Sequence, residues 1–336
     1  MVTLATVSKV AGVSTATVSR VLNQPHKVDR NTRQVVEKAI EKLGYRPNQY
    51  ARGLASKTSK TIGVIVNRFS STYYGFMLDG VEEALVEYGY KTLAESSRET
   101  AEGENQALLS LIDRQCDALV IHTNKLTDIE LAQYQNKARP IVFMNRKVQA
   151  CENESIYLDN KSAGQLAASY LLQKGHTSFA MVTGPKSYHE SVSRTNGFIS
   201  TLKEHAITID KDCIIESDFT VQGGYDSLCR LLKQQKHFTA IFFHNDEMAA
   251  GAYKACREHG IAIPSQISIL GFDDAVIASH LTPGLTTIEQ PLAEIGRASG
   301  LLALSLLKNK PEIFQGSKLF TATVKERDSV KDINRE

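Results

Sequence analysis

Apolar residues recur at helical spacing three times within the first 45 residues. Residues 4–11 and 31–43 both show a period of three to four, which predicts two amphipathic helices. Between them, Gly12 interrupts the pattern, and Ser14 is a suitable N-cap for another helix that ends near Asn23. Three helices in so few residues predict a helix-turn-helix unit. The apolar positions expected to face its core are Leu4, Val7, Val10, Ala11, Val18, Val21, Leu22, Val35, Ala39, Ile40 and Leu43.

Residues 47–60 have no comparable apolar pattern. Pro47 and Asn48 can begin a helix, and residues 49–56 are long enough for two turns. Because an isolated helix of this length is marginal in water, we expect a linker that becomes ordered only in contact with a partner.

From Thr61 onward, short apolar stretches alternate with amphipathic ones. Strands are expected at 62–66, 118–122, 141–145, 155–159, 179–183, 240–244 and 268–272. Helices are expected at 76–88, 103–114, 163–174, 192–205, 223–234, 247–259 and 292–307. This alternation predicts doubly wound parallel sheets that bind ligands at the carboxyl ends of their strands. The segment is long for one such unit, so two α/β lobes facing a cleft are expected.

Charge separates the helical segment from the remainder. Residues 1–60 contain eleven Lys and Arg against three acids, whereas the whole chain has a net charge of only +2. A basic module ahead of a mildly acidic body indicates a polyanionic partner for the module. No apolar run is long enough to span a membrane, and no secretory signal is visible at the N-terminus. The five cysteines form no CxxC pair, which favours reduced thiols in the cytoplasm.

The segment TLATVSKVAGVSTATVSRVLN at residues 3–23 resembles the N-terminal signature of the lactose-repressor family. RPNQYARGLASK resembles the hinge helix of that family. FTAIFFHNDEMAAGAY, ISILGFDD, LTTIEQP and VKERDSV resemble successive landmarks of its effector-binding core, so the resemblance covers essentially the whole chain. His122, the Asn145–Arg146 pair and residues 238–252 are most similar to galactose-type repressors within the family.

The resemblance implies three parts: an all-α helix-turn-helix headpiece at residues 1–46, a hinge at 47–60 and a core at 61–336. The core would resemble periplasmic sugar-binding proteins, with two α/β lobes of doubly wound parallel sheet joined by three crossings. We expect lobe one at 61–160 and 290–318, and lobe two at 161–289 and 319–336.

The expected DNA contacts lie on the second helix and in the hinge. The N-terminal part of a recognition helix faces base edges, where Arg20 can pair with guanine and Thr15 and Ala16 can contact thymine methyl groups. Thr17 and Ser19 are expected at phosphates. In the hinge, the resemblance places Leu54 in the minor groove as an apolar wedge, with Asn48, Arg52 and Ala55 beside it.

The resemblance also places a small-molecule pocket between the lobes. Its expected residues are Tyr73, His122, Asn145, Arg194, Phe219, Asn245 and Asp273. Carboxylate, amide and guanidinium groups together can bind the vicinal hydroxyls of a sugar. His122 could equally be a core histidine, and either Asn245 or Asp246 could cap the following helix. Asn145 stands where the lactose repressor has an acid, which disfavours lactose-like inducers and fits the galactose-type subgroup.

Three other classes of protein were compared with the sequence: an enzyme, a periplasmic binding protein and a purine-dependent regulator. GxSxG, GxxxxGK[ST], HExxH and GxGxxG motifs are absent, so we expect no catalytic residue, cofactor or metal. The basic headpiece argues against a periplasmic binding protein. A purine-dependent regulator of the same family would have arginine and threonine after Gly184–Pro185, where this chain has Lys186 to His189.

We therefore expect a sugar-responsive DNA-binding regulator, most simply a repressor, with operator DNA and a small sugar as its partners. A homodimer is expected because two-fold symmetry matches a palindromic operator. The chain ends at Glu336 without a leucine heptad, so no tetramerising tail is expected.

Overall fold

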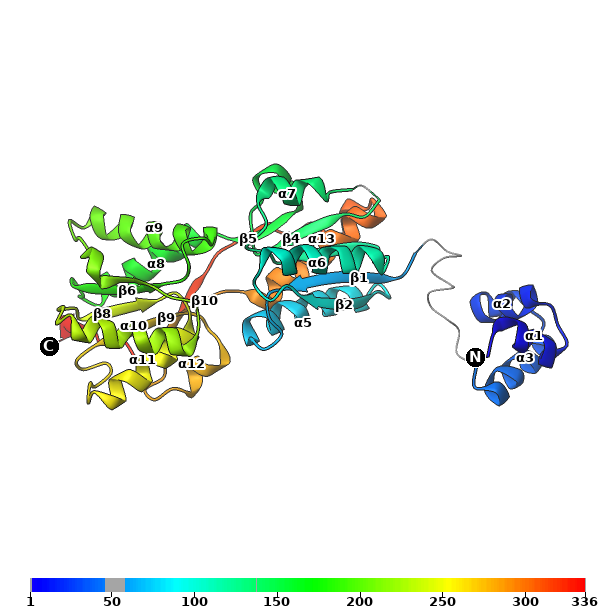
Figure 1. Ribbon diagram of the computed structural model, residues 1–336, viewed down its shortest axis with the longest axis horizontal. Helices are drawn as coiled ribbons and strands as arrows, with labels where there is room; N and C mark the ends of the chain where they lie inside the picture. Colours follow the sequence, from blue (N-terminus) through cyan, green and yellow to red (C-terminus); the bar gives the residue numbers. More distant parts are fainter. Residues whose placement is uncertain (1, 46–57, 137, 336) are drawn as a thin grey trace. The chain divides into compact units, whose positions relative to one another are not determined.

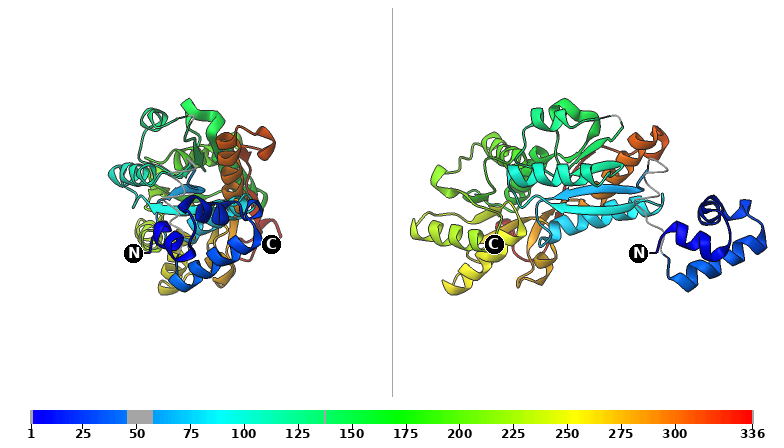
Figure 2. Two further views of the ribbon diagram at one scale, coloured as in Figure 1. Left: turned by 90° about the vertical axis from the view of Figure 1, so that its right-hand side faces the viewer. Right: turned by 45° about the vertical axis from the view of Figure 1, so that its right-hand side comes forward.

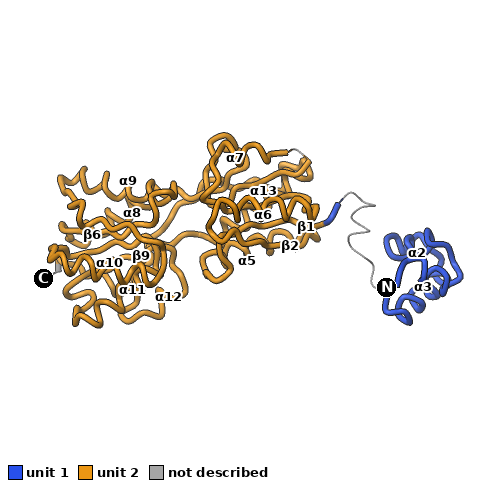
Figure 3. The backbone as a smooth tube through the Cα atoms, viewed as in Figure 1, with its two compact units in different colours: residues 1–59 blue, residues 60–336 orange. Residues whose placement is uncertain are grey.

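The computed structural model describes residues 2–45, 58–136 and 138–335. They form two compact units, residues 1–59 and 60–336, which are described separately (Figure 3). The proposed hinge residues Asn48, Arg52, Leu54 and Ala55 lie outside the described residues.

The first unit is a bundle of three α-helices. These are α1 (Leu4–Ala11), α2 (Thr15–Asn23) and α3 (Arg30–Leu43), with a short 3-10 turn, η1 (Pro25–Lys27), between the last two. The side chains of Thr3, Ser14 and Asp29 cap the three helices by accepting backbone N–H bonds in the first turns. Gly12 at the end of α1 has φ 64°, a left-handed conformation that favours glycine.

The face of α3 that is buried in the bundle differs from the face that the sequence predicted. Val36 is fully buried, whereas Val35, which we expected to face inward, is 48% exposed. The helix begins at Arg30, and its buried face runs through Val36, Ala39, Ile40 and Leu43, at spacings of three, four and seven. Val10 on α1 is also exposed rather than buried.

Lobe one of the second unit is a six-stranded sheet flanked by helices. Its strands run in the order β11 (Leu319–Phe320), β5 (Ser155–Leu158), β4 (Ile141–Met144), β3 (Ala118–Ile121), β1 (Thr61–Val66) and β2 (Lys91–Ser96), all parallel. The surrounding elements are α5 (Thr72–Val86), α6 (Ala101–Asp113), α7 (Asp128–Gln133), η2 (Gln149–Glu154), α13 (Leu292–Lys308) and η4 (Pro311–Ile313).

Lobe two repeats this architecture. Its sheet has the order β12 (Thr323–Lys325), β10 (Thr286–Glu289), β9 (Ser268–Asp273), β8 (Ala240–Phe243), β6 (Phe179–Thr183) and β7 (Ile214–Glu216). The helical elements are α8 (Asn160–Gln173), α9 (His189–Glu204), η3 (Lys211–Cys213), α10 (Val221–Lys233), α11 (Asp246–Glu258), α12 (Val276–His280) and η5 (Ile333–Arg335). The pairing of β12 with β10 is antiparallel, which departs from the all-parallel sheet that we expected.

Both faces of each sheet are covered by helices (Figures 1 and 2). Ile62, Val64 and Val66 of β1 pack into the core shared with α5 and α13, whereas Ile65 packs with α6 and α7. Alternate side chains therefore serve opposite faces, as the two-residue period of a strand requires. Continuous burial on both faces explains why these strands read as unbroken apolar runs.

The chain passes between the lobes three times, after β5, after β10 and after β11, as the green, orange and red segments in the middle of Figure 1. The third crossing lies between Phe320 and Thr323, because Leu319 and Phe320 pair with β5 in lobe one. The expected boundary at residue 318 therefore comes slightly too early.

Three helix pairs approach closely at reciprocal glycines. A Cβ on Gly164 of α8 would lie 2.0 Å from the carbonyl oxygen of Arg194, and one on Gly197 of α9 would lie 2.0 Å from that of Lys161. The pair α5 and α13 has the same arrangement at Gly80 and Gly296, and α10 and α11 have it at Gly224 and Gly251. Any side chain at these positions would separate the helices.

None of the helices in the described part of the chain has the length and apolar character needed to cross a membrane.

Candidate functional site

A cavity of about 110 Å³ lies between the two lobes of the second unit. Loops that follow β1, β2 and β3 line it from lobe one, and loops that follow β6, β7, β8 and β9 line it from lobe two. These are the carboxyl ends of parallel strands, where doubly wound sheets place their ligand sites. Of the seven expected residues, six line the cavity: Tyr73, His122, Arg194, Phe219, Asn245 and Asp273.

Arg194 is buried beneath the cavity, on α9. Its guanidinium donates to the carbonyl oxygen of His244 and, over 2.8 Å, to Oδ1 of Asn160. It also stacks on the ring of Phe272, with 3.3 Å from Cζ to the ring centroid. Burial lowers the pKa of Arg194 to about 10, so the guanidinium remains charged at neutral pH. This side chain is held within the pocket and is not part of a surface ion pair.

Asp273 ends β9 in the same lobe and directly follows Phe272, on whose ring Arg194 stacks. Burial raises the pKa of its carboxyl to about 7, although the Arg194 charge acts in the other direction. Gln290, in the second crossing, donates to Oδ1 of Asp273. The backbone is strained here, because Asp273 and Asp274 have φ values of 109° and 55°. Such strain often marks a functional site.

Two buried histidines face the cavity from opposite lobes. Burial lowers the pKa of His122 to about 4 and that of His244 well below its ordinary value, so both rings are neutral. A neutral imidazole has one donor and one acceptor nitrogen. His122 was expected as a candidate, whereas His244 was not.

Asn145 lies behind the cavity wall. Its Nδ2 donates to the hydroxyl of Tyr73 over 2.6 Å, and Tyr73 lines the cavity. Asn145 has φ 54°, a conformation that Asn tolerates better than most residues. Asn145 thus does not line the pocket itself, but its hydrogen bond positions Tyr73, which does.

Asn245 has a structural task as well as a place in the pocket wall. Its Oδ1 caps α11 by accepting from the N–H of Met248, and its Nδ2 donates to the carbonyl oxygen of Phe219. Asp246 does not cap the helix. Its carboxylate instead accepts from Thr287 Oγ1 and from the N–H of Ala275, which supports the loop after Asp273.

Several polar atoms around the cavity are buried and have no hydrogen-bond partner among the described residues. They are His122 Nδ1, Asn145 Oδ1, Arg194 Nε, His244 Nε2 and Gln290 Oε1. Leaving a buried polar group unpaired costs about 1–3 kcal/mol, so most native proteins avoid it. Their concentration around one cavity suits a ligand rich in both donors and acceptors.

Sequence reasoning missed several residues that the fold brings to the cavity, among them Glu190, His244 and Gln290. His244 and Gln290 lie within the segments FFHND and LTTIEQP, each directly after a strand, so their positions at strand ends were an available signal. Glu190 precedes Arg194 by one helical turn on α9, which places both side chains on the same helix face.

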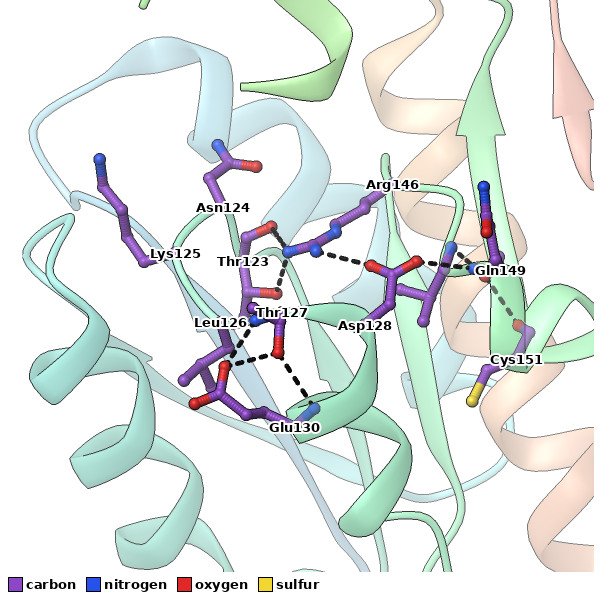
Figure 4. A network of polar contacts seen from close by, with 12 residues as sticks. Thr123, Asn124, Lys125, Leu126, Thr127, Asp128, Glu130, Arg146, Gln149 and Cys151 are labelled. Atoms are coloured by element: carbon purple, nitrogen blue, oxygen red, sulfur yellow. Dashed lines mark hydrogen bonds and ion pairs between the residues drawn. The ribbon is translucent and has the colours of Figure 1, made fainter. Parts of the chain in front are cut away.

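Arg146, which we grouped with Asn145, supports the loop after β3 (Figure 4). Its guanidinium donates to the backbone oxygen of Thr123 and forms a 2.8 Å ion pair with Asp128. The buried carboxylate of Glu104 accepts backbone N–H bonds from the same loop, including that of Asn124, which lines the cavity. The network therefore fixes one wall of the pocket.

The first unit offers a separate polar face. Thr15, Ala16 and Arg20 of α2 are exposed on the side opposite buried Val18 and Val21. Thr17 and Ser19 are half-buried, and Thr17 Oγ1 lies 2.9 Å from Ser14 Oγ at the helix cap.

A helix-turn-helix unit joined to a two-lobed α/β core with a polar internal pocket defines a DNA-binding regulator that responds to a small molecule. Residues 2–48 match the family described as bacterial regulatory proteins, lacI family, and residues 168–330 match the periplasmic binding protein-like domain. The chain belongs to the LacI family and is a sequence-specific transcriptional regulator.

Individual relatives agree over almost the full length. The HTH-type transcriptional regulator GalR of Escherichia coli strain K12 is 34% identical over 330 residues, covering 98% of this chain and 96% of GalR. This match is consistent with the galactose-type subgroup.

Two solved structures are similar in fold. The lac repressor dimer bound to operator and the anti-inducer ONPF has a TM-score of 0.86 at 28% identity, covering 98% of this chain and 99% of that one. A sugar-binding transcriptional regulator of the LacI family from Escherichia coli, complexed with phosphate, has a TM-score of 0.74 at 28% identity, covering 82% and 99%.

Proposed function

We propose that this regulator binds a palindromic operator as a homodimer and that a small sugar in the pocket between its lobes controls operator affinity. The observation that carries the proposal is the cluster of unpaired buried donors and acceptors around the cavity. Vicinal hydroxyl groups both donate and accept hydrogen bonds, so a sugar can satisfy this mixed set.

The shape of the pocket supports a compact ligand. Its volume of about 110 Å³ is below the roughly 300–1,000 Å³ of clefts that hold drug-sized molecules. Tyr73 and Phe219 supply aromatic surface for the apolar face of a sugar ring. The similar Escherichia coli protein named above is described as sugar-binding, which agrees with this choice.

At the headpiece, we propose that Thr15, Ala16 and Arg20 contact base edges and that Thr17 and Ser19 contact phosphates. The exposed face of α2 supports this assignment. For the hinge, the resemblance alone supports insertion of Leu54 into the minor groove, with Asn48, Arg52 and Ala55 beside it. A protein with this role acts where the chromosome is, so we propose a cytoplasmic location.

The dimer is supported by the similar lac repressor, whose structure is a dimer on its operator. A second headpiece doubles the number of base contacts and matches a two-fold symmetric site. Sedimentation of the full chain at micromolar concentration tests this, because a monomer alone would contradict it.

The ligand proposal is tested by a thermal-shift screen of monosaccharides, disaccharides and purines. A ligand that binds only the native state raises the melting temperature by mass action. We expect a sugar to do so, and Arg194→Ala and Asp273→Ala to abolish the shift while operator binding persists. A purine that raises the melting temperature in place of every sugar would overturn the proposal.

A further inference from the structure

The charges that line the pocket are predominantly negative. Two guanidinium groups, those of Arg68 and Arg194, face five carboxylates: Glu99, Glu190, Asp218, Glu247 and Asp273. Burial raises the pKa of Asp273 to about 7, so this carboxyl is only partly ionised at neutral pH, and burial also raises the pKa of Glu190. Poor solvation thus makes negative charge costly at both positions. An anionic ligand would add further negative charge to a site that is already acidic.

Both guanidinium groups are already engaged. Arg194 donates to the carbonyl oxygen of His244 and to Asn160 through its two terminal nitrogens, while its Nε has no partner among the described residues. Arg68 forms a 2.6 Å ion pair with Glu99 at the pocket rim. In both side chains, terminal N–H groups that could bind a phosphate already donate to the protein.

The helix N-termini at the pocket are occupied in a similar way. The N-terminus of a helix carries partial positive charge and commonly binds anions. Here α9 carries Glu190 in its first turn, and α11 carries Asp246 and Glu247. Acidic side chains in these first turns oppose the binding of a phosphate group at either N-terminus.

Glu190 is a carboxylate in position to contact a ligand. It lines the cavity one helical turn before Arg194 and accepts no hydrogen bond from another residue within the described ranges. Its oxygen atoms can therefore accept hydrogen bonds from ligand hydroxyl groups, but they would repel a ligand phosphate or carboxylate.

We propose that the pocket selects uncharged sugars and that Glu190 is the residue that excludes their anionic derivatives, such as sugar phosphates and uronic acids. This inference rests on the proposed sugar-binding function and names the chemical class of the effector. A phosphate monoester carries nearly two negative charges at neutral pH, so its exclusion is expected to be strong.

The test is calorimetric titration of the full chain with neutral hexoses and disaccharides, each paired with its 6-phosphate, and with the corresponding uronic acids. At least one neutral sugar is expected to bind, with its 6-phosphate at least tenfold weaker. Glu190→Gln removes the charge at nearly constant shape and is expected to raise the affinity ratio of phosphate to parent sugar at least tenfold.

Two further variants separate charge from other effects. Glu190→Asp keeps the charge and is expected to keep the exclusion. Glu204→Gln makes the same charge change at the exposed end of α9 and is expected to leave the ratio unchanged. Melting temperatures confirm that each variant is folded.

The outcomes are distinguishable. A 6-phosphate that binds wild type more tightly than its parent sugar overturns the charge selection and leaves sugar binding intact. A ratio that moves equally in Glu190→Gln and Glu204→Gln overturns the role of Glu190. If no sugar of either kind binds, the proposed function fails and the charge selection falls with it.

Discussion

Arg327 Nη2 lies 2.6 Å from Asp274 Oδ1, and this ion pair joins the C-terminal segment to the residue that follows Asp273. The same guanidinium donates to the carbonyl oxygen of Leu285 over 2.8 Å. Both charged side chains are largely buried, at 19% and 18% exposure. The strained backbone at Asp273 and Asp274 is thus held from outside the pocket.

Arg327→Ala is expected to weaken sugar binding about tenfold, because it leaves Asp274 partly buried without its cation and releases the backbone that presents Asp273. Titration of the full chain with its sugar measures this. Lys236→Ala, which breaks an exposed ion pair with Asp210, is the control and should leave affinity unchanged. Equal losses in both variants would show that Arg327 has no special link to the pocket.

Asp273→Asn is expected to change how the stability of the core depends on pH. The folded pKa is raised from 3.8 to about 7, so ionisation of this carboxyl opposes folding. Its favourable contribution is complete below about pH 4 and is lost as pH rises through 7. The free energy of unfolding of the variant minus that of wild type should therefore increase across this window, by at most about 1.4 kcal/mol per pH unit.

Urea unfolding at several pH values between 4 and 8 measures that difference. Glu190 and Asp246 also have raised pKa values, so wild-type stability alone would not isolate Asp273. A difference that stays constant with pH would contradict the role of burial at Asp273.

Arg20→Ala is expected to reduce discrimination between operator and random duplex by about 1–3 kcal/mol, because a bidentate contact to guanine is lost. The operator is first selected from a pool of random duplexes, and affinities are then compared by titration. Arg33→Ala is the control, since Arg33 lies on α3 and pairs with Glu37. It should weaken binding to all duplexes alike, and an equal effect of the two variants on discrimination would refute the assignment.

Val36→Ala is expected to destabilise the headpiece by about 1–3 kcal/mol, because a fully buried side chain leaves a cavity. Val35→Ala, one residue earlier and 48% exposed, should change stability by less than about 0.5 kcal/mol. Hydrogen exchange of backbone amides in residues 2–45 of the full chain measures both. The reverse order would favour the helix phase that the sequence suggested.

Much of the architecture follows from the sequence, because strands buried on both faces are continuous apolar runs. The strand β2 was not predicted, since it lies at the sheet edge and its sequence KTLAES has only two apolar residues. The phase of α3 was misjudged because Val35 and Val36 are equally apolar, and only packing against α1 decides between them.

The pocket was predictable where a residue ends a strand within a recognisable motif, as Asp273 does. Glu190 could not be assigned in this way, because it ends no strand and only its spacing of one helical turn before Arg194 on α9 points to the pocket. For Asn145, the sequence predicted a place near the pocket. It could not predict the hydrogen bond to Tyr73, because that contact depends on tertiary structure.

The glycine contacts between paired helices restrict how the core can deform. Because Gly164 and Gly197 bring the backbones of α8 and α9 together, neither helix can slide along the other without a steric clash. The pairs α5–α13 and α10–α11 are restricted in the same manner. Each lobe is therefore expected to move as a rigid body, with the three crossings as the hinge between the lobes. A ligand that contacts both lobes in the pocket is therefore expected to change the angle between the lobes rather than the shape of either lobe.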